Sequence, residues 1–299
     1  MLAPERLSAS AAAVCHHAIR SHHENQTRRA LAGFLAIARE LPDAAVTVVS
    51  TPRNVAALRP SHPSIRFHAL PFVPADHGLP ADSESMSSLP VPAFIDLFEA
   101  FETLEPAFDD YLSGLRGGES GADVCVVADA FVAWTVGAAR RRGCAHAVFV
   151  SCGAFGTAIF HALWRHMPAL PFVSDGGGGS GSSTLRLPEH PDVELHRSQL
   201  SPAFLLRGDL SDRWTAFYLR MIRHGYRTGA VLANTVEELE PTGLVMMRRT
   251  LDGKVPVWPV GPLVRGDDSS ETDGGGVLRW LDSQPPSSVL YISFGSQNT

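Results

Sequence analysis

Four cysteines in 299 residues are few, and their spacing excludes the usual cysteine-based sites. No two of them stand as Cys-x-x-Cys, so nothing indicates a zinc site or a redox pair, and the number is too low for a disulfide-rich secreted scaffold. Three of them, Cys125, Cys144 and Cys152, lie in or beside apolar runs. We therefore expect buried, reduced thiols and a reducing compartment.

Long apolar runs and basic runs are also missing. No apolar stretch approaches the roughly 18 residues that a membrane-spanning helix needs, and the N-terminus lacks a continuous hydrophobic segment of the signal-peptide type. The formal net charge of -6 is spread along the chain, which disfavours nucleic acid and anionic membranes as partners. We expect a cytoplasmic protein, monomeric and without a membrane span.

Glycine motifs that bind dinucleotides or nucleoside triphosphates are absent. No Gly-x-Gly-x-x-Gly follows any predicted strand, which disfavours a nicotinamide-dependent oxidoreductase. The nearest candidate is the Gly-Ala-Phe-Gly turn at residues 153–156, between a predicted strand and a predicted helix, and it lacks a P-loop lysine. Such a turn can bind a phosphate, but a tight turn that lets the helix lie close to the strand is the favoured interpretation.

The chain does contain a repeated strand–helix pattern. Short β-branched apolar runs alternate with segments whose apolar residues recur at helical spacing, which predicts an α/β fold with a parallel sheet and helices on both faces. The predicted strands are residues 46–50, 65–70, 124–129, 147–151 and 230–234, with a proline-containing edge strand at 257–262. The predicted helices are residues 31–41, 53–59, 94–115, 134–142 and 210–227. The aromatic stripe of the third helix is interpreted as core rather than as a cofactor site.

The first 29 residues differ from the rest of the chain. They contain no β-branched apolar run, although a doubly wound sheet normally begins with a strand. We therefore expect a disordered segment at 1–29 and no strand before the helix at 31–41. A metal site is disfavoured, since only Glu24 accompanies the histidines of this segment at ligand spacing. These histidines are His16, His17, His22 and His23.

Asp129 ends the most continuous apolar run of the chain, residues 124–128. A run without alternation is typical of a strand that is buried on both faces. Ligands of open α/β sheets bind beyond the carboxyl ends of the strands, so Asp129 stands where a site is expected. A carboxylate at a strand-to-helix turn can also be a simple helix cap. The residues alone leave both roles open.

The C-terminal part reads as the start of a second unit. Thr235-Val236-Glu237-Glu238 predicts a capping box at the start of a helix. Residues 267–276 consist of Asp, Ser, Glu, Thr and Gly, a composition typical of a linker between domains. A short helix at 277–283 and an apolar strand at 288–296 follow. Because no later segment covers that strand, we expect a second domain that begins here and is cut off.

Several segments, taken in order, resemble the plant UDP-dependent glycosyltransferases of family 1, which have two facing Rossmann-like domains, the GT-B fold. The resemblance covers residue 31 to the end. The segments that carry it are VTVVSTPRN (46–54), the loop at 70–90, residues 126–134, ANTVEELEP (233–241), VWPVGPL (257–263), WLDSQPP (280–286) and SVLYISFGS (288–296). The resemblance implies a Rossmann-like, N-terminal acceptor domain of a GT-B fold.

The family resemblance implies transfer of a hexose, with glucose expected, from a UDP-sugar to a hydroxyl of a small hydrophobic, flavonoid-like acceptor. In that family a His after the first strand takes the proton of the acceptor hydroxyl, and an Asp, matched here by Asp129, orients the His. The position of the His is occupied by Ala30, and the donor box of the family would follow beyond Thr299. We therefore expect this chain to be inactive.

Further residues are assigned to binding by the same resemblance. Ser293, Gly295 and Ser296 would contact the UDP phosphates, where backbone N–H groups and hydroxyls suit an anion. Phe131 and Phe155 are expected to contact the acceptor, among a wider set of aromatic residues on the loops: Phe72, Trp164, Phe172 and Phe204. No metal or other cofactor is expected, because the UDP-sugar is a substrate.

The expected domain division follows from these assignments. It comprises the atypical segment 1–29, the acceptor domain 30–265, a linker with a short helix at 266–287, and the first strand of a donor domain at 288–299. A competing hypothesis is a non-catalytic fragment that binds small hydrophobic molecules without transferring sugar.

Overall fold

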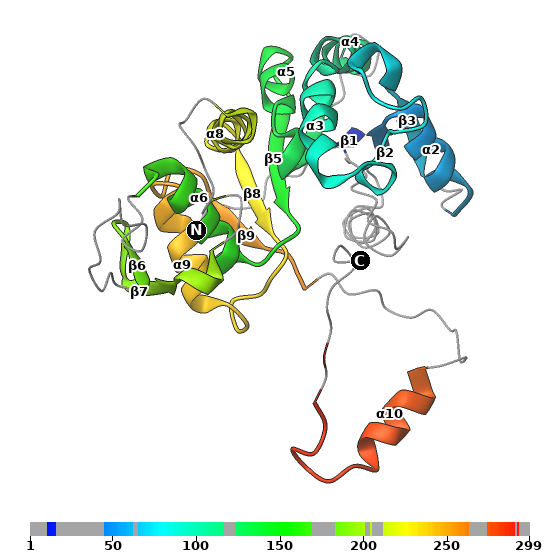
Figure 1. Cartoon of the computed structure of the whole chain (residues 1–299). Coiled ribbons are helices and arrows are strands. Elements are labelled where there is room, and N and C mark those ends of the chain that lie inside the picture. Colours follow the sequence, from blue (N-terminus) through cyan, green and yellow to red (C-terminus); the bar gives the residue numbers. More distant parts are fainter. Residues whose placement is uncertain are drawn as a thin grey trace.

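The computed structural model describes residues 11–15, 45–61, 65–116, 123–168, 183–200, 204, 212–262, 274–290 and 292. In these residues one parallel sheet has the strand order β3-β2-β1-β4-β5-β8-β9, and an antiparallel hairpin, β6-β7, forms a separate two-stranded sheet (Figure 1). The strands of the sheet are β1 (Ala11–Cys15), β2 (Ala45–Ser50), β3 (Arg66–Ala69), β4 (Cys125–Asp129), β5 (Ala145–Val150), β8 (Ala230–Ala233) and β9 (Val257–Pro259). The hairpin consists of β6 (Thr184–Leu187) and β7 (His190–His196).

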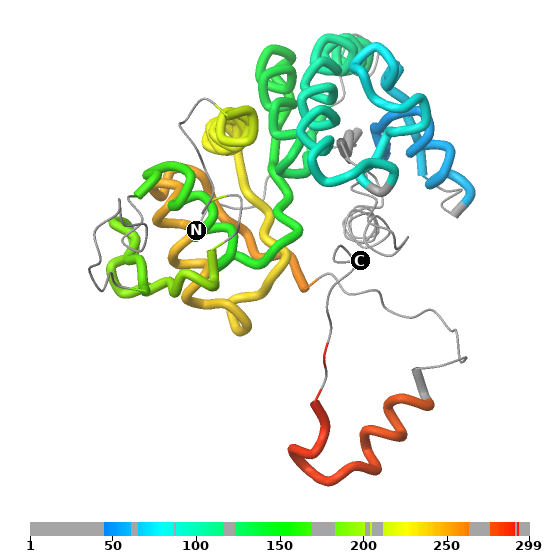
Figure 2. The backbone as a smooth tube through the Cα atoms, viewed as in Figure 1, coloured from blue at the N-terminus to red at the C-terminus, as the bar shows by residue number. Residues whose placement is uncertain are grey.

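Eight α-helices lie within the described ranges, and most of them connect strands of the sheet. They are α2 (Pro52–Leu58), α3 (Phe94–Glu102), α4 (Glu105–Arg116), α5 (Thr135–Arg141), α6 (Ala154–His166), α8 (Arg213–Gly225), α9 (Pro241–Thr250) and α10 (Gly274–Asp282). Figure 2 shows the chain passing through β8 into α9, which packs along α6. The helix expected at 31–41 lies outside the described residues. The other expected strands and helices up to residue 262 are largely confirmed, but the helix expected at 94–115 is two helices, which separate at Thr103 and Leu104.

The expectation that no strand precedes the helix at 31–41 is wrong. β1 pairs in parallel with both β2 and β4, so it is an interior strand of the sheet. Its sequence, Ala-Ala-Ala-Val-Cys, has a single β-branched residue, and that is why the pattern gave no strand signal. Pairing with β2 and β4 gives β1 backbone hydrogen bonds on both sides, and these stabilise a strand that its residues do not favour by themselves. The other residues of segment 1–29 lie outside the described ranges.

Helices cover both faces of the sheet, as expected from the sequence. Val48 of β2 packs with Leu58 of α2, whereas its neighbour Val49 joins a cluster that includes Leu97 and Phe98 of α3. Successive residues of a strand point to opposite faces, so α2 and α3 lie on opposite sides. In β4, Val126, Val127 and Ala128 are all buried, and the continuous apolar run is thereby explained.

The aromatic stripe of 94–115 is core, as interpreted from the sequence. Leu97, Phe98, Phe101 and Phe108 are each at most 3% exposed. Phe98 stacks on Phe217 of α8 with ring centroids 5.2 Å apart. The contact joins α3 to α8 across the face of the sheet, so these rings stabilise the packing of two helices.

The end of the described chain stands apart from the sheet. α10 lies away from the other helices in Figure 1, and its Val277, Leu278 and Trp280 are 54 to 62% exposed. The strand expected at 288–296 is not formed at the four positions of it that are described, 288–290 and 292. A strand requires a hydrogen-bonded neighbour, and none of the strands described here passes beside this segment.

The capping box expected at Thr235–Glu238 is also wrong. α9 begins only at Pro241, and the side chain of Glu237 instead accepts hydrogen bonds from Arg248 of α9 at 3.0 Å. Proline is favoured in the first turn of a helix, where its missing N–H costs nothing, so the start at Pro241 is the physically preferred one. Glu240 is the N-cap residue of α9, but its side chain makes no capping hydrogen bond to that helix and is available for another role.

Candidate functional site

The strand order places Asp129 where α/β sheets bind ligands. Successive strands run from β1 outward through β2 and β3 in one direction and through β4, β5, β8 and β9 in the other, so the order reverses between β1 and β4. Crevices at such a reversal, beyond the carboxyl ends of the strands, are the usual ligand sites. β4 ends at Asp129, and its preceding residue, Ala128, pairs with Cys15 at the end of β1.

Asp129 is a buried carboxyl group with one hydrogen bond among the described residues. Its Oδ1 accepts the N–H of Phe131 at 2.9 Å, which caps the short turn that follows β4. Burial raises the pKa of Asp129 to about 6, and the hydrogen bond from Phe131 opposes this rise only in part. The capping role considered from the sequence is therefore real. It leaves Oδ2 for another donor.

Phe131 lies beside this carboxyl group as one side of an aromatic group. Its ring is half-buried and stacks on Phe98 with centroids 4.9 Å apart, while Phe217 lies 6.3 Å away. The stack fixes the ring orientation, because Phe98 and Phe217 are buried in the core. Phe131 therefore presents a rigid apolar surface next to Asp129.

Cys152 belongs to the same edge, two residues after β5, and it is exposed rather than buried as the sequence led us to expect. Partial desolvation of its sulfur still raises the pKa of the Cys152 thiol, and the Asp129 carboxylate adds to the rise. A thiol with a raised pKa is a poor nucleophile near neutral pH. Cys152 therefore contributes a small, uncharged wall to the site rather than a reactive group.

Glu240 holds the Gly-Ala-Phe-Gly turn. Its Oε2 accepts the N–H of Ala154 at 2.9 Å and its Oε1 accepts the N–H of Phe155 at 3.3 Å, so the first turn of α6 is capped from the loop before α9. Burial acts to raise the pKa of Glu240, but the Thr235 side chain and these two N–H groups outweigh it, and the pKa lies below its usual range. The Glu240 carboxylate thus accepts the N–H groups of Ala154 and Phe155, which are the donors that a phosphate would need.

Two glycines make this cap possible. A Cβ on Gly153 would lie 2.6 Å from both carboxylate oxygens of Glu240, and a Cβ on Gly243 would lie 2.5 Å from the backbone nitrogen of Phe155. Both distances are too short for any side chain, so α6 and α9 approach through glycine. The structure therefore supports the tight-turn interpretation of residues 153–156. Phe155, whose side chain is 39% exposed, is positioned by this contact.

A second polar cluster lies after β2. Asn54 donates from Nδ2 to Thr51 Oγ1 at 2.8 Å and to the carbonyl of Glu84 at 2.9 Å. The N–H of Arg53 donates to Glu84 Oε2 at 2.8 Å. These bonds join the start of α2 to the long loop at 71–92, so this loop is anchored at the same edge of the sheet as Asp129.

The structure brings only some of the expected site residues together. Asp129 and Phe131 are in direct contact, and Phe155 lies on the next strand-to-helix connection. Phe72, Trp164 and Phe204 are at most 6% exposed and belong to the core, so their expected place on a binding surface is not supported. Ala30, Phe172, Ser293, Gly295 and Ser296 lie outside the described residues.

Sequence reasoning missed the role of Glu240. The residue belongs to the segment ANTVEELEP, but its partners are 85 and 86 positions away in the chain, and no local pattern indicates such a contact. The only sequence signal is indirect: Pro241 favours a helix start at that position, which places Glu240 at the N-cap position but does not indicate which N–H groups its side chain accepts.

Neither a metal site nor a membrane helix emerges from the described ranges. No group of three or more His, Cys, Asp or Glu side chains there is arranged to hold a metal ion. None of the helices in these ranges is both long and apolar enough to cross a membrane.

No protein-family model matches the sequence, but comparison with known proteins identifies plant glycosyltransferases as relatives. Crocetin glucosyltransferase 3 of Crocus sativus is 33% identical over 282 residues, which is 88% of this chain and 57% of the relative. UDP-glycosyltransferase 92A1 of Arabidopsis thaliana is 33% identical over 261 residues, which is 85% of this chain and 51% of the relative. This chain thus spans about half the length of the curated relatives that it matches.

The fold agrees with the sequence relationship. The crystal structure of Glycyrrhiza uralensis UGT73P12, complexed with glycyrrhetinic acid 3-O-monoglucuronide, superposes with a TM-score of 0.67 at 28% identity and covers 97% of this chain and 57% of its own. The parallel sheet is accordingly the Rossmann-like sheet of a GT-B protein. By sequence and by fold, this chain belongs to the plant family 1 UDP-glycosyltransferases.

Proposed function

We propose that this chain supplies the acceptor-binding part of a UDP-glycosyltransferase. The reaction is transfer of a hexose, glucose in this proposal, from a UDP-sugar to a hydroxyl of a small hydrophobic, flavonoid-like acceptor. The observation that supports it most is the position of Asp129: a buried carboxyl at the reversal of strand order, next to the half-buried ring of Phe131. The family relationship gives the reaction class.

Apolar side chains around Asp129 favour an apolar acceptor. Phe131 is held by the aromatic core, and Phe155 is held through its backbone by Glu240. A flat aromatic molecule is bound well by fixed rings, because little side-chain entropy is lost on binding. The low polarity also strengthens any hydrogen bond that Asp129 makes in the site.

Asp129 is suited to orient a base rather than to act as one. A neutral hydroxyl needs a base within hydrogen-bond reach, and an imidazole whose other nitrogen donates to a carboxylate is held in the right tautomer and is stabilised when it becomes charged. Oδ2 of Asp129 has no partner among the described side chains and can accept such an N–H. An imidazolium beside it would lower the pKa of Asp129.

We further propose that the chain alone turns over slowly. Ala30 stands at the position where the family has its catalytic His, and loss of a general base costs about 10²–10⁴-fold in rate. The test is turnover of UDP-glucose with a flavonol, followed by chromatography of the glucoside. A rate at least about 100-fold below that of a full-length relative is expected. A rate equal to that of the relative would refute the proposed inactivity but would support the proposed reaction.

A non-catalytic module that binds small hydrophobic molecules is the second candidate. The resemblance that matches Ala30 to the catalytic His favours it, because loss of a general base need not abolish binding of the acceptor. Calorimetry with each ligand alone distinguishes the two functions. A binding module binds the flavonol but gives no heat with UDP-glucose, whereas a chain that itself transfers sugar, however slowly, binds both. Heat with UDP-glucose alone and none with the flavonol would contradict both.

A further inference from the structure

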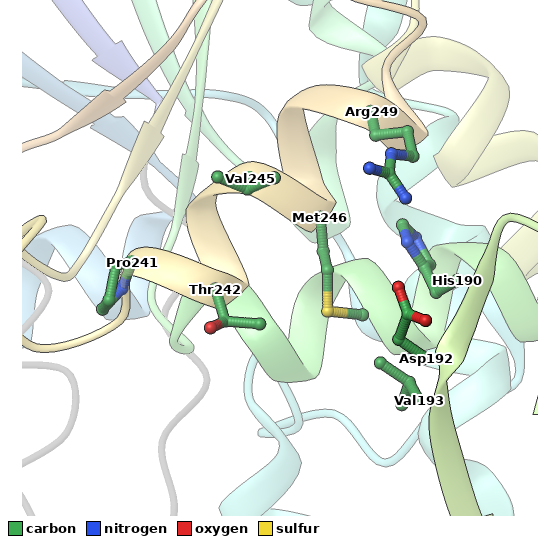
Figure 3. A pocket seen from close by; sticks show the side chains of 8 residues that line it. All are labelled: His190, Asp192, Val193, Pro241, Thr242, Val245, Met246 and Arg249. Atoms are coloured by element: carbon green, nitrogen blue, oxygen red, sulfur yellow. The ribbon is translucent and has the colours of Figure 1, made fainter.

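A pocket with a volume of about 320 Å³ lies between β7 and α9. Its lining comes from His190, Asp192 and Val193 on β7 and from Thr242, Met246 and Arg249 on α9, among others (Figure 3). None of the lining residues takes part in the site around Asp129. The volume is at the lower end of the range for small-molecule sites, about 300–1,000 Å³.

Three polar side chains gather at one end of this pocket. Figure 3 shows the guanidinium of Arg249 on one side of the His190 ring and the carboxylate of Asp192 on the other. Arg249 donates from Nη1 to the carbonyl of Glu189 at 3.3 Å, which leaves its remaining N–H groups for a ligand. Asp192 is exposed and forms no ion pair with any described side chain. The pocket thus offers one positive and one negative group.

His190 is the unusual member of the three. Its side chain is 2% exposed, and Nε2 is hydrogen-bonded to Thr250 Oγ1 at 3.0 Å, but the buried Nδ1 has no partner. A buried polar atom without a partner costs free energy, so a small rotation of the ring that brings Nδ1 to the pocket would be favoured by a ligand group there. Burial is the main cause that lowers the pKa of His190, and it favours the neutral ring.

The rest of the lining is apolar. Met246 is 5% exposed and lies along the floor, Val193 is half-buried, and Val245 is 51% exposed at the rim. Figure 3 places the thioether of Met246 between the polar end and Thr242. A thioether and branched side chains form an adaptable surface for an aliphatic or aromatic group.

We propose that this pocket binds a free α-amino acid with an apolar side chain. Arg249 binds the carboxylate, Asp192 binds the ammonium group, and the ligand side chain lies on Met246 and Val193. A zwitterion matches a site with one cation and one anion, whereas a simple carboxylate or a simple amine would leave one of these charges unpaired or repelled.

His190 can complete the binding in either tautomer. If Nε2 accepts the hydrogen of Thr250 Oγ1, then Nδ1 carries the proton and donates to the ligand carboxylate. If Nε2 donates to Thr250, then Nδ1 accepts from the ligand ammonium group. After such a rotation, either end of an α-amino acid can pair with this nitrogen. This proposal does not depend on whether the chain transfers sugar.

The test uses the methyl NMR signal of Met246 in the full chain. The sequence has six methionines, so methyl-labelled methionine gives a simple spectrum, and Met246→Leu identifies the signal. L-Phenylalanine is the probe, because its side chain suits the pocket volume. We expect the Met246 signal to shift in a saturable way with a dissociation constant of about 1 mM, the range for a ligand of this size.

Two fragments and three variants make the test specific. Phenethylamine lacks the carboxylate and 3-phenylpropionate lacks the ammonium group, and each should bind at least about tenfold more weakly than phenylalanine. Arg249→Gln and Asp192→Asn should each weaken the binding of phenylalanine by a similar factor. Arg248→Gln is the matched control, because the Arg248 guanidinium pairs with Glu237 and does not line the pocket. The affinity of this variant for phenylalanine should equal that of the wild type.

The proposal is overturned if the Met246 signal does not move at phenylalanine concentrations up to about 20 mM. It is also overturned if either fragment shifts the signal as strongly as phenylalanine, or if Arg249→Gln and Arg248→Gln have the same effect. Both arginines and Asp192 are at least partly exposed, so these variants are expected to fold, and the unchanged signals of the other methionines check this.

Discussion

Replacement of Asp129 by asparagine should stabilise the folded chain at alkaline pH. Burial raises the pKa of Asp129 to about 6 from its ordinary value of 3.8, so the folded state disfavours the charged carboxylate. The asparagine side chain would keep an oxygen that accepts the N–H of Phe131 but would carry no charge. The variant gains stability because no cation among the described residues lies beside Asp129 to offset the cost of burying its charge. An uncompensated carboxylate is expected where the partner of Asp129 is a histidine.

The magnitude follows from the shift in pKa. A rise of about two units corresponds to about 3 kcal/mol of differential free energy between the two protonation states. Because the folded pKa is raised, the contribution of Asp129 to stability is complete below about pH 4 and is lost as the pH rises to about 6. Asp129→Asn should therefore exceed the wild type by about 3 kcal/mol at pH 8 and by only about 1.5 kcal/mol at pH 5.

Urea denaturation of both proteins at pH 5 and pH 8, followed by circular dichroism, measures the difference. Asp82→Asn is the control, because Asp82 is exposed and its replacement should change the free energy of unfolding by no more than about 0.5 kcal/mol at either pH. A variant that is less stable than the wild type at pH 8, or a difference that does not depend on pH, would refute the reasoning.

Two further predictions concern the contact between α6 and α9. Glu240→Gln places an amide N–H opposite the backbone N–H of Ala154 or of Phe155, so that one backbone donor loses its acceptor. The free energy of unfolding should fall by about 1–2 kcal/mol. An unchanged urea midpoint would show that the cap is not stabilising. Gly243→Ala forces a methyl group against the backbone of Phe155 and should lower the free energy of unfolding by about 1–3 kcal/mol. Gly276→Ala is the control and should not lower it, because the added Cβ meets nothing within 4 Å. Equal effects of the two variants would contradict the argument.

The fold could be predicted from the sequence where the hydrophobic pattern was strong. The continuous runs of β4, β5 and β8 identified buried parallel strands, because residues on both faces of these strands are apolar. β1 could not be predicted, since its alanines carry little strand preference and the strand forms because β2 and β4 pair with it on both sides. Tertiary pairing there outweighs local propensity.

The site was predictable only in part, for the same reason. Asp129 ends a recognisable strand, so its place at the carboxyl edge followed from the pattern. The cap by Glu240 joins segments that are more than 80 residues apart, and the tight approach of Gly243 to Phe155 depends on the packing of two helices. Such contacts have no signature in a single sequence.

The most direct test of the central claim, that the carboxyl edge around Asp129 binds an apolar acceptor, is calorimetric titration of the chain with a flavonol. We predict saturable binding that Phe155→Ala weakens by about tenfold, since the lost contact of one aromatic ring is worth about 1–2 kcal/mol. Trp258→Ala is the matched control, because Trp258 is 54% exposed on β9 and should not affect binding. Absence of flavonol binding, or equal effects of the two variants, would contradict the account.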